Sequence, residues 1–361
     1  MEEGAIEVAK GLDKVIIDKT GIASTDNEGN LVYRGYQAVD LAENASFEQT
    51  AYLIVYGRMP SKGELKDFSS FLVSHSGLDG NTEKIISMLP KNTSIIDLLR
   101  SIVSLMPLKE TSNDRILLEI AAKMPRISSD GYRLLRGMPV LKDIDGSYAE
   151  RFYYLLTGST DKLSAKYFER MLILYMEHEF NASTFTLRVT ASTLADPRAS
   201  VTAALAAIKG PLHGGANAEI LNYMLKMKSK DEAVSFVEGK LARHEKIMGF
   251  GHRIYKKLDP RAQYVKGQLR GLAKLRKMDK LYEFSTAMEK TIWDKKQIPA
   301  NLDFYAAIYM HLLGIDEAFY TPIFASSRSF GWAAHYIEQV SDNKLIRPDS
   351  RYVGPTGLRV K

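Results

Sequence analysis

Residues 248–262 read Met-Gly-Phe-Gly-His-Arg-Ile-Tyr-Lys-Lys-Leu-Asp-Pro-Arg-Ala, and the rest of the chain is organised around this stretch. Two glycines flank Phe250, so the backbone can turn tightly there and lie close to a ligand. His252 follows at once, and a dense set of cations comes after it, namely Arg253, Lys256, Lys257 and Arg261. A histidine and arginines after a tight turn favour an anionic ligand that carries a carbonyl group. On these residues alone, a solvated basic loop is the simpler interpretation.

Length and composition are those of a globular protein. The 361 residues are enough for about two domains at roughly 150 residues each. Hydrophobic residues make up 45% and charged residues 25% of the chain, and the absence of cysteine excludes disulfides and thiolate chemistry. The start is acidic, unlike a signal peptide, and no apolar run approaches the roughly 18 residues of a membrane helix. We therefore expect a soluble, cytoplasmic protein with no membrane partner.

The formal net charge is +6, which raises the question of nucleic-acid binding. Proteins of that kind gather Lys and Arg on one face or carry a known motif, whereas here the basic residues are spread along the chain. We attribute the charge to a solvated surface and a few arginines that bind a small anion. A nucleic-acid-binding module and a noncatalytic helical scaffold remain the alternatives from other classes.

The pattern of the chain predicts a mainly α fold with a short N-terminal β-hairpin. The hairpin would pair residues 14–20 with 31–36 across the turn-rich residues 26–30. Apolar periodicity and capping boxes such as Ser46-x-x-Gln49 predict helices over most of the remaining chain, at residues 46–57, 61–75, 94–107, 112–138, 148–156, 164–182, 184–194, 198–209, 217–227, 231–245, 260–276, 278–295, 302–313, 316–320 and 326–340. Residues 341–361 show no periodicity and are expected to form an extended arm.

Three of the seven histidines lie in turn or helix-end contexts beside small or polar residues, namely His178, His213 and His252. The other four, His75, His244, His311 and His335, have no such setting and are interpreted as surface or core residues. A metal site is disfavoured because no His-x-x-x-His or His-Glu-x-x-His pair places two ligands on one helical turn.

One aspartate and three arginines complete the set of candidates. Asp303 stands between Leu302 and Phe304 at a predicted helix start, where it is either a first-turn acid or a general base in a partly apolar pocket. Arg261, Arg328 and Arg347 are candidates for carboxylate binding, since the planar guanidinium matches a carboxylate with two hydrogen bonds.

These motifs together resemble the citrate synthase family. The most specific is Gly-Phe-Gly-His-Arg-Ile-Tyr-Lys-Lys-Leu-Asp-Pro-Arg at residues 249–261, followed by Gly-Pro-Leu-His-Gly-Gly-Ala-Asn at 210–217. Weaker matches extend from Lys10-Gly-Leu-Asp-Lys14 and Tyr33-Arg-Gly-Tyr36 to Arg347-Pro348 and Tyr352-Val-Gly-Pro355, so that the resemblance covers nearly the whole chain. It implies a homodimer with a large domain, residues 1–214 and 315–361, and a small inserted domain, residues 215–314.

The resemblance also implies roles for single residues. His213, His252 and Asp303 would be catalytic. His178, Arg261 and Arg328 would bind oxaloacetate, and Arg347 would reach it from the second subunit. Coenzyme A would be held by Lys246, Ile247, Met248, Gly249, Phe250, Arg253 and Lys256.

No metal and no permanently bound cofactor is implied, because the acyl-CoA is a co-substrate. The implied reaction condenses acetyl-CoA with oxaloacetate and hydrolyses citryl-CoA to citrate and CoA. A 2-methylcitrate synthase, which uses propionyl-CoA, is the alternative within the family, because one extra methylene changes binding by only about 1–3 kcal/mol.

Overall fold

The computed structural model describes residues 10–12, 14–26, 29–214, 218–251, 254–255 and 257–360. Its described part is mainly helical, as predicted, with a small sheet near the N-terminus. Three of the predicted site residues, His252, Arg253 and Lys256, lie outside the described residues.

The sheet has three short antiparallel strands in the order β1 (Ala23–Thr25), β2 (Leu31–Tyr33) and β3 (Tyr36–Gln37). The hairpin is therefore present, but the prediction of its first strand at residues 14–20 is wrong. Those residues include Ile16, which is 89% exposed, so their β-branched side chains have no core to pack against. The strand begins only at Ala23, where Ile22 and Ala23 become buried.

The helices form a continuous series, and most begin where the sequence offers a side-chain cap. Ser46, Ser61 and Ser147 each form a complete capping box with the residue three positions later. The helices are α1 (Ala38–Asn44), α2 (Phe47–Tyr56), α3 (Lys62–Ser74), α4 (Gly80–Met88), α5 (Ile95–Leu105), α6 (Asn113–Leu135), α7 (Tyr148–Thr157), α8 (Lys162–Tyr175), α9 (Ala182–Ser192), α10 (Pro197–Ile208), α11 (Ala218–Met224), α12 (Lys230–Ala242), α13 (Pro260–Leu275), α14 (Asp279–Lys296), α15 (Leu302–Leu312), the 3₁₀ turn η1 (Glu317–Phe319) and α16 (Tyr320–Ser341).

Two helices, α1 and α4, were not predicted, α16 begins at Tyr320 and not at residue 326, and the largest shortening is in α8. The periodicity over residues 164–182 indicates one helix, but α8 ends at Tyr175. Glu179 then adopts a left-handed backbone with φ +52°, and Asn181 caps α9 by accepting a hydrogen bond from the Thr184 N–H at 3.2 Å. The resulting turn, residues 176–181, carries His178.

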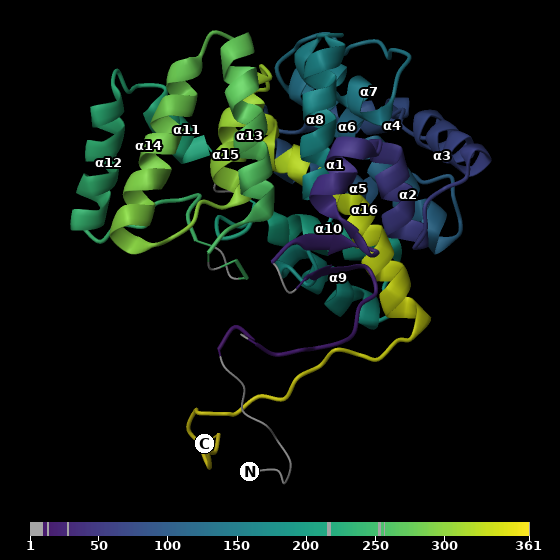
Figure 1. The fold of residues 1–361 in the computed structure, drawn as a ribbon. Coiled ribbons are helices and arrows are strands. Elements are labelled where there is room, and N and C mark those ends of the chain that lie inside the picture. Colours follow the sequence, from purple (N-terminus) through teal and green to yellow (C-terminus); the bar gives the residue numbers. More distant parts are fainter. Residues whose placement is uncertain are drawn as a thin grey trace.

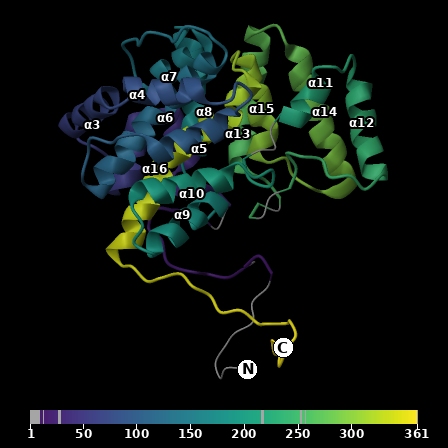
Figure 2. The same cartoon turned by 180° about the vertical axis from the view of Figure 1, so that it is seen from behind.

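The helices fall into two groups, and α13 packs against members of both. Figures 1 and 2 show α11 to α15 together on one side of the molecule and α1 to α8 on the other. Helix α16 packs against α2, α6, α8 and α9, while α13 packs against α14, α15 and α1. The division into residues 1–214 with 315–361 and residues 215–314 remains a proposal.

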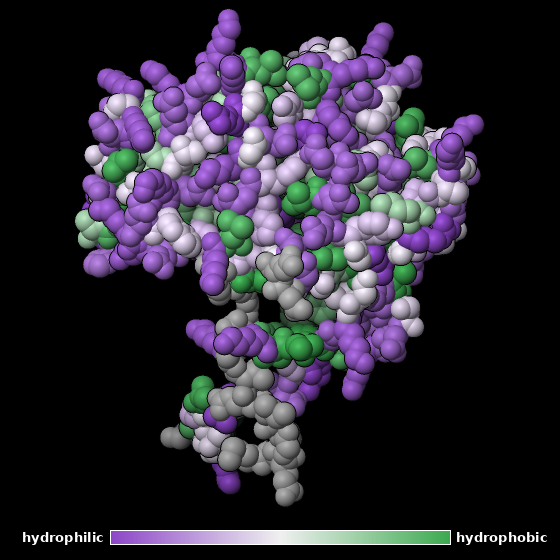
Figure 3. Space-filling view, in the orientation of Figure 1, coloured by the Kyte–Doolittle hydropathy of each residue, from purple (hydrophilic) through white to green (hydrophobic). Residues whose placement is uncertain are grey.

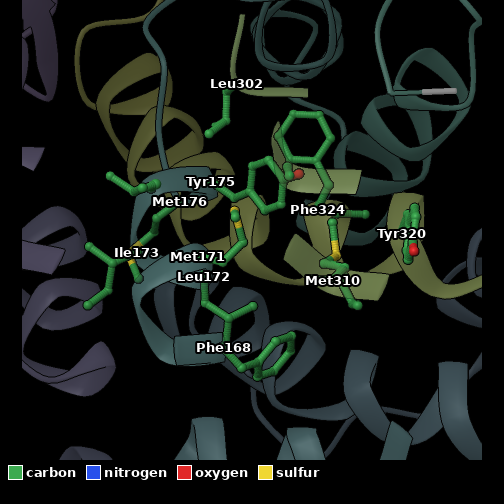
Figure 4. Packing of buried hydrophobic residues seen from close by; sticks show 14 of the residues in the cluster. Phe168, Met171, Leu172, Ile173, Tyr175, Met176, Leu302, Met310, Tyr320 and Phe324 are labelled. Atoms are coloured by element: carbon green, nitrogen blue, oxygen red, sulfur yellow. The ribbon is translucent and has the colours of Figure 1, made fainter. Parts of the chain in front are cut away.

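The core where side chains of α8, α15 and α16 meet is dense and aromatic. Figure 4 shows Tyr175 close to Phe324, with ring centroids 4.8 Å apart, and Phe168, Leu172 and Met310 packed nearby. Side chains from α8, α15 and α16 thus meet in one apolar cluster. A polar group in this region must find a partner or remain costly.

The C-terminal residues 342–360 leave the helical body as an extended arm, as predicted (Figure 1). Several of its apolar side chains are exposed, including Leu345 at 55% and Val353 at 90%. The space-filling view in Figure 3 shows a mostly hydrophilic face on the helical body. No helix in the described ranges combines the length and apolar composition of a membrane crossing.

Candidate active site

The turn between α8 and α9 places His178 beside the core, where it is only 6% exposed. The buried hydroxyl of Tyr33 holds this turn by donating to the carbonyl oxygen of Glu177 at 3.0 Å. The ring of His178 meets the ring of Tyr255 edge to face, with centroids 5.7 Å apart. The sheet therefore supports the position of a histidine that lies far from it in sequence.

His213 follows α10 and is tied to the start of α9. Its Nε2 atom lies 2.8 Å from the Ser183 hydroxyl and accepts a hydrogen bond from the Ser183 N–H at 3.3 Å. Burial, assisted by the positive charge of Arg328, lowers the pKa of His213 to about 4, so the ring is neutral at pH 7. Because Nε2 accepts the backbone N–H, the ring proton is on Nδ1, which can then donate to a ligand.

Arg328 lies in the middle of α16 and is 2% exposed. Its Nε donates to the Tyr175 carbonyl oxygen at 2.7 Å, and its guanidinium lies over the Phe324 ring, 4.6 Å from the centroid. A terminal nitrogen, Nη1, is buried without a hydrogen-bond partner in the described part of the chain. Burial lowers the pKa of Arg328 to about 10, which still leaves it charged at neutral pH. A buried cation with a vacant donor is suited to an anionic ligand.

The glycine-rich stretch is joined directly to the helix that carries Asp303. The Gly251 N–H donates to the Pro299 carbonyl at 2.8 Å, and the Asn301 N–H donates to the Gly249 carbonyl at 2.9 Å. Asn301 also caps α15 by accepting the Asp303 N–H at 3.1 Å. Residues 249–251 thus fix the first turn of α15, on which the partly exposed Asp303 stands.

Arg261 is buried and paired within its own helix start. Its Nε and Nη2 donate to the two carboxylate oxygens of Asp259 at 3.0 and 2.9 Å. Asp259 also accepts the Leu302 N–H at 3.2 Å, so that one carboxylate links the starts of α13 and α15. Arg261, which is expected to bind a substrate carboxylate, therefore already forms an ion pair with a residue that links two helix starts.

Tyr175 shows which of these groups converge. Its hydroxyl is fully buried and has no hydrogen-bond partner among the described residues. Burial raises the pKa of Tyr175 well above its ordinary value; the charge of Asp303 adds to this effect, whereas Arg261 and Arg328 oppose it. The hydroxyl therefore lies within electrostatic reach of three predicted site residues from α13, α15 and α16.

Other predicted residues are not brought to this point. Arg347 lies on the exposed C-terminal arm, where it is paired with Asp349 at 3.3 Å, and its action on a second subunit stays a prediction. Among the expected coenzyme A contacts, Lys246 is exposed, Ile247 is buried and Met248 is half-buried. The Phe250 ring packs on Phe304, with centroids 4.5 Å apart, so this side chain lies against the first turn of α15.

Sequence reasoning missed Tyr175, Glu177 and Asp259. Tyr175 lies in an apolar run that reads as plain core, and Asp259 precedes a proline where a cap or a helix stop is the usual interpretation. The only signal for them in the sequence was that they lie within a few residues of His178 or Arg261. Separately, no group of three or more His, Asp or Glu side chains in the described part is arranged to hold a metal ion, and the absence of a metal stays a prediction.

The helical fold, the buried arginines and the buried, neutral imidazole of His213 are typical of an enzyme that acts on a small anionic substrate. The family model described as citrate synthase, C-terminal domain, matches residues 11–349. The chain belongs to the citrate synthase family, and it is an enzyme of the acyltransferase class.

Individual relatives support the same assignment. Citrate synthase 2 of Bacillus subtilis is 38% identical over 96% of each chain, and the 2-methylcitrate synthase of Shewanella oneidensis is 39% identical over 95% of this chain and 94% of its own. The crystal structure of the Thermotoga maritima citrate synthase is 38% identical, has a TM-score of 0.90 and covers 98% of both chains. The Thermoplasma acidophilum citrate synthase, solved with carboxymethyl coenzyme A and oxaloacetate, is 33% identical, with a TM-score of 0.90 and 98% coverage of both chains.

Proposed function

We propose that this enzyme condenses acetyl-CoA with oxaloacetate and hydrolyses the resulting citryl-CoA to citrate and CoA. The observation that carries the proposal is the buried Arg328 guanidinium, which has a vacant donor at Nη1 among the described residues and lies within electrostatic reach of Asp303. A dicarboxylate would supply the missing acceptor, and its arrival would place the ketone beside the proposed base.

The first chemical step is removal of a proton from the α-carbon of the acyl thioester. Asp303 is the proposed base, because it stands at the first turn of α15 and is partly exposed, so that a ligand can reach it. As the enolate forms, negative charge grows on the thioester oxygen. The Nδ1–H of the neutral His213 would donate to that oxygen, in the tautomer that Ser183 selects.

The second step joins the enolate carbon to the ketone carbon of oxaloacetate, and the ketone oxygen takes up a proton to become a hydroxyl. His252, which lies outside the described residues, is proposed to polarise that ketone. Arg261, Arg328 and His178 would bind the oxo-acid, with Arg347 contributed by the second copy of a homodimer. Water then breaks the C–S bond and releases CoA with the tricarboxylate.

Coenzyme A is proposed to lie along residues 246–250 with Arg253 and Lys256. The positive φ of Gly249, +83°, and of Gly251, +79°, turns the backbone there, which allows a close approach of a ligand. A site without a permanently bound cofactor and a cytoplasmic location remain predictions.

A second candidate function, 2-methylcitrate synthesis from propionyl-CoA, has direct support from the comparisons. Its relatives are as similar as the citrate synthases are, at 39% and 38% identity, and one Bacillus subtilis relative, 37% identical, is named citrate/2-methylcitrate synthase. Overall identity therefore does not choose between the two acyl groups.

The test is release of the CoA thiol from acetyl-CoA and from propionyl-CoA, each with and without oxaloacetate. The proposal predicts oxaloacetate-dependent release with the larger kcat/KM for acetyl-CoA. A larger kcat/KM for propionyl-CoA would select the second function, and no oxaloacetate-dependent release from either would overturn both.

A further inference from the structure

A fully buried carboxylate, Glu177, packs against α16 one turn from Arg328 and has no role in the proposed mechanism. Its neighbours Met176 and His178 belong to the same turn between α8 and α9, residues 176–181, and the Glu177 side chain itself is 0% exposed. A Cβ placed on Gly331 would lie 2.2 Å from its Oε2, so this oxygen rests directly on the backbone of α16. Gly331 is three residues after Arg328 and shares its helix face.

One oxygen of Glu177 is held by a chain of oriented hydrogen bonds. Its Oε1 lies 3.0 Å from Nε2 of the buried His335. Nδ1 of His335 lies 3.2 Å from Nη1 of Arg188, and a guanidinium can only donate, so Nδ1 accepts. The Nε2–H of His335 therefore donates to Glu177, and this one bond leaves the carboxylate charge without a full partner.

The cation at the end of this chain is already neutralised. Arg188 forms ion pairs with Glu338 at 2.7 Å and Asp18 at 2.9 Å, and it donates to Gln339 at 3.0 Å. Its charge is therefore not available to Glu177. Tyr33, which is neutral, Arg34 and Arg328 also lie within electrostatic reach of this carboxylate.

The second oxygen of Glu177 and the vacant nitrogen of Arg328 form a matched pair of unsatisfied groups. Oε2 of Glu177 and Nη1 of Arg328 are both buried without a hydrogen-bond partner in the described residues. Glu177 is also the strongest charge that favours the cationic form of Arg328 against the effect of burial. No ion pair joins Glu177 to Arg328 among the described residues, so Arg328 keeps its donor open.

We propose that Glu177 is the internal counter-ion of Arg328 in the empty site, and that it lowers the affinity for oxaloacetate because the substrate carboxylate must share the same cation. The inference rests on the proposed function of Arg328 and adds a residue that sets how tightly the oxo-acid binds. His335 and Arg188 act as positioning residues, since they hold the carboxylate against α16.

Removal of the charge in Glu177→Gln has two effects of opposite sign. The free enzyme loses the counter-ion of a buried cation and becomes less stable. The bound enzyme loses a repulsion between two carboxylates, so oxaloacetate binds more tightly. A residue with a merely structural role would weaken both stability and binding.

The experiment compares the wild type with Glu177→Gln and Glu177→Asp by isothermal titration with oxaloacetate, by thermal unfolding with and without it, and by steady-state kinetics. We expect Glu177→Gln to melt at a lower temperature, to bind oxaloacetate several-fold more tightly and to be stabilised more by it, with a lower KM for oxaloacetate. Glu177→Asp keeps the charge and should stay near the wild-type affinity. An oxaloacetate affinity that is unchanged or weaker in Glu177→Gln would overturn the proposal.

A second comparison needs no substrate and remains decisive if Glu177→Gln does not fold. In Glu177→Gln with Arg328→Met, both charges are removed, so the double variant should recover much of the melting temperature that Glu177→Gln loses. A double variant that melts no higher than Glu177→Gln, or that like Glu177→Gln does not fold, would refute the pairing. A wild type that neither binds oxaloacetate nor releases CoA would instead refute the proposed function, and the melting cycle would still report on the pair.

Discussion

Replacement of Gly249 by alanine tests the link between the glycine-rich stretch and the helix that carries Asp303. At φ +83° an alanine pays the left-handed penalty of about 1–2 kcal/mol. Its Cβ would also lie 2.8 Å from the Cβ and 3.0 Å from the Cα of Phe304, contacts that only a shift of backbone can relieve. Overpacking of this kind costs about 1–3 kcal/mol, and together with the backbone penalty the expected destabilisation is about 2–5 kcal/mol.

The same shift displaces the neighbour of Phe304, the proposed base Asp303. A misplacement of about 1 Å can lower a rate about 100-fold, so we expect kcat to fall by one to two orders of magnitude, more than KM changes. Turnover is followed by release of the CoA thiol, and stability by thermal unfolding.

The matched control is Gly158→Ala. Gly158 has a similar φ of +74° at the end of α7, but nothing lies within 4 Å of an added Cβ. This variant should lose only the about 1–2 kcal/mol of stability that a left-handed backbone costs an alanine, and it should keep its kcat. Equal kcat in the Gly249→Ala variant and the wild type would refute the coupling between this stretch and α15.

Three further predictions concern single site residues. Asp303→Ala should keep oxaloacetate binding in a titration and lose turnover by orders of magnitude; near-normal turnover would exclude it as the base. Arg328→Lys should raise the KM for oxaloacetate more than it lowers kcat, because the planar fork is lost, and an unchanged KM would contradict the assignment. Burial lowers the pKa of His213 to about 4, so between about pH 6.5 and 4 the unfolded chain binds a proton that the folded chain lacks, and stability falls as the pH drops through that window. Thermal unfolding of His213→Gln should show a smaller loss over this range, and the same slope as the wild type would argue against a buried neutral ring.

Much of the fold follows from local signals in the sequence. The capping boxes at Ser46 and Ser61 and the apolar periodicity locate helices correctly, because caps and amphipathic faces depend on neighbours only a few residues away. The failures have tertiary causes. Residues 14–20 look like a strand, yet Asp18 instead reaches Arg188 of α9, a contact 170 positions away. The turn that follows the end of α8 at Tyr175 is fixed by the distant hydroxyl of Tyr33, which donates a hydrogen bond to the Glu177 carbonyl oxygen.

The site was harder to predict from the sequence than the fold was. His213 and Asp303 stand in recognisable motifs, and the structure gives His213 a partner, Ser183, that no spacing rule indicates. Glu177 and Tyr175 carry no motif at all. Their importance comes from burial beside Arg328, a property of packing between α8 and α16 that only the assembled chain reveals.

The most direct test of the proposed condensation uses acetyl-CoA with a fully deuterated methyl group, oxaloacetate and mass spectrometry of the products. Condensation breaks one C–D bond and forms one C–C bond, so the mechanism predicts free CoA and a tricarboxylate that has lost a single deuteron. The Asp303→Ala variant should form almost none of it. Release of CoA together with acetate that retains its full deuterium content, in place of the tricarboxylate, would show simple thioester hydrolysis and contradict the mechanism.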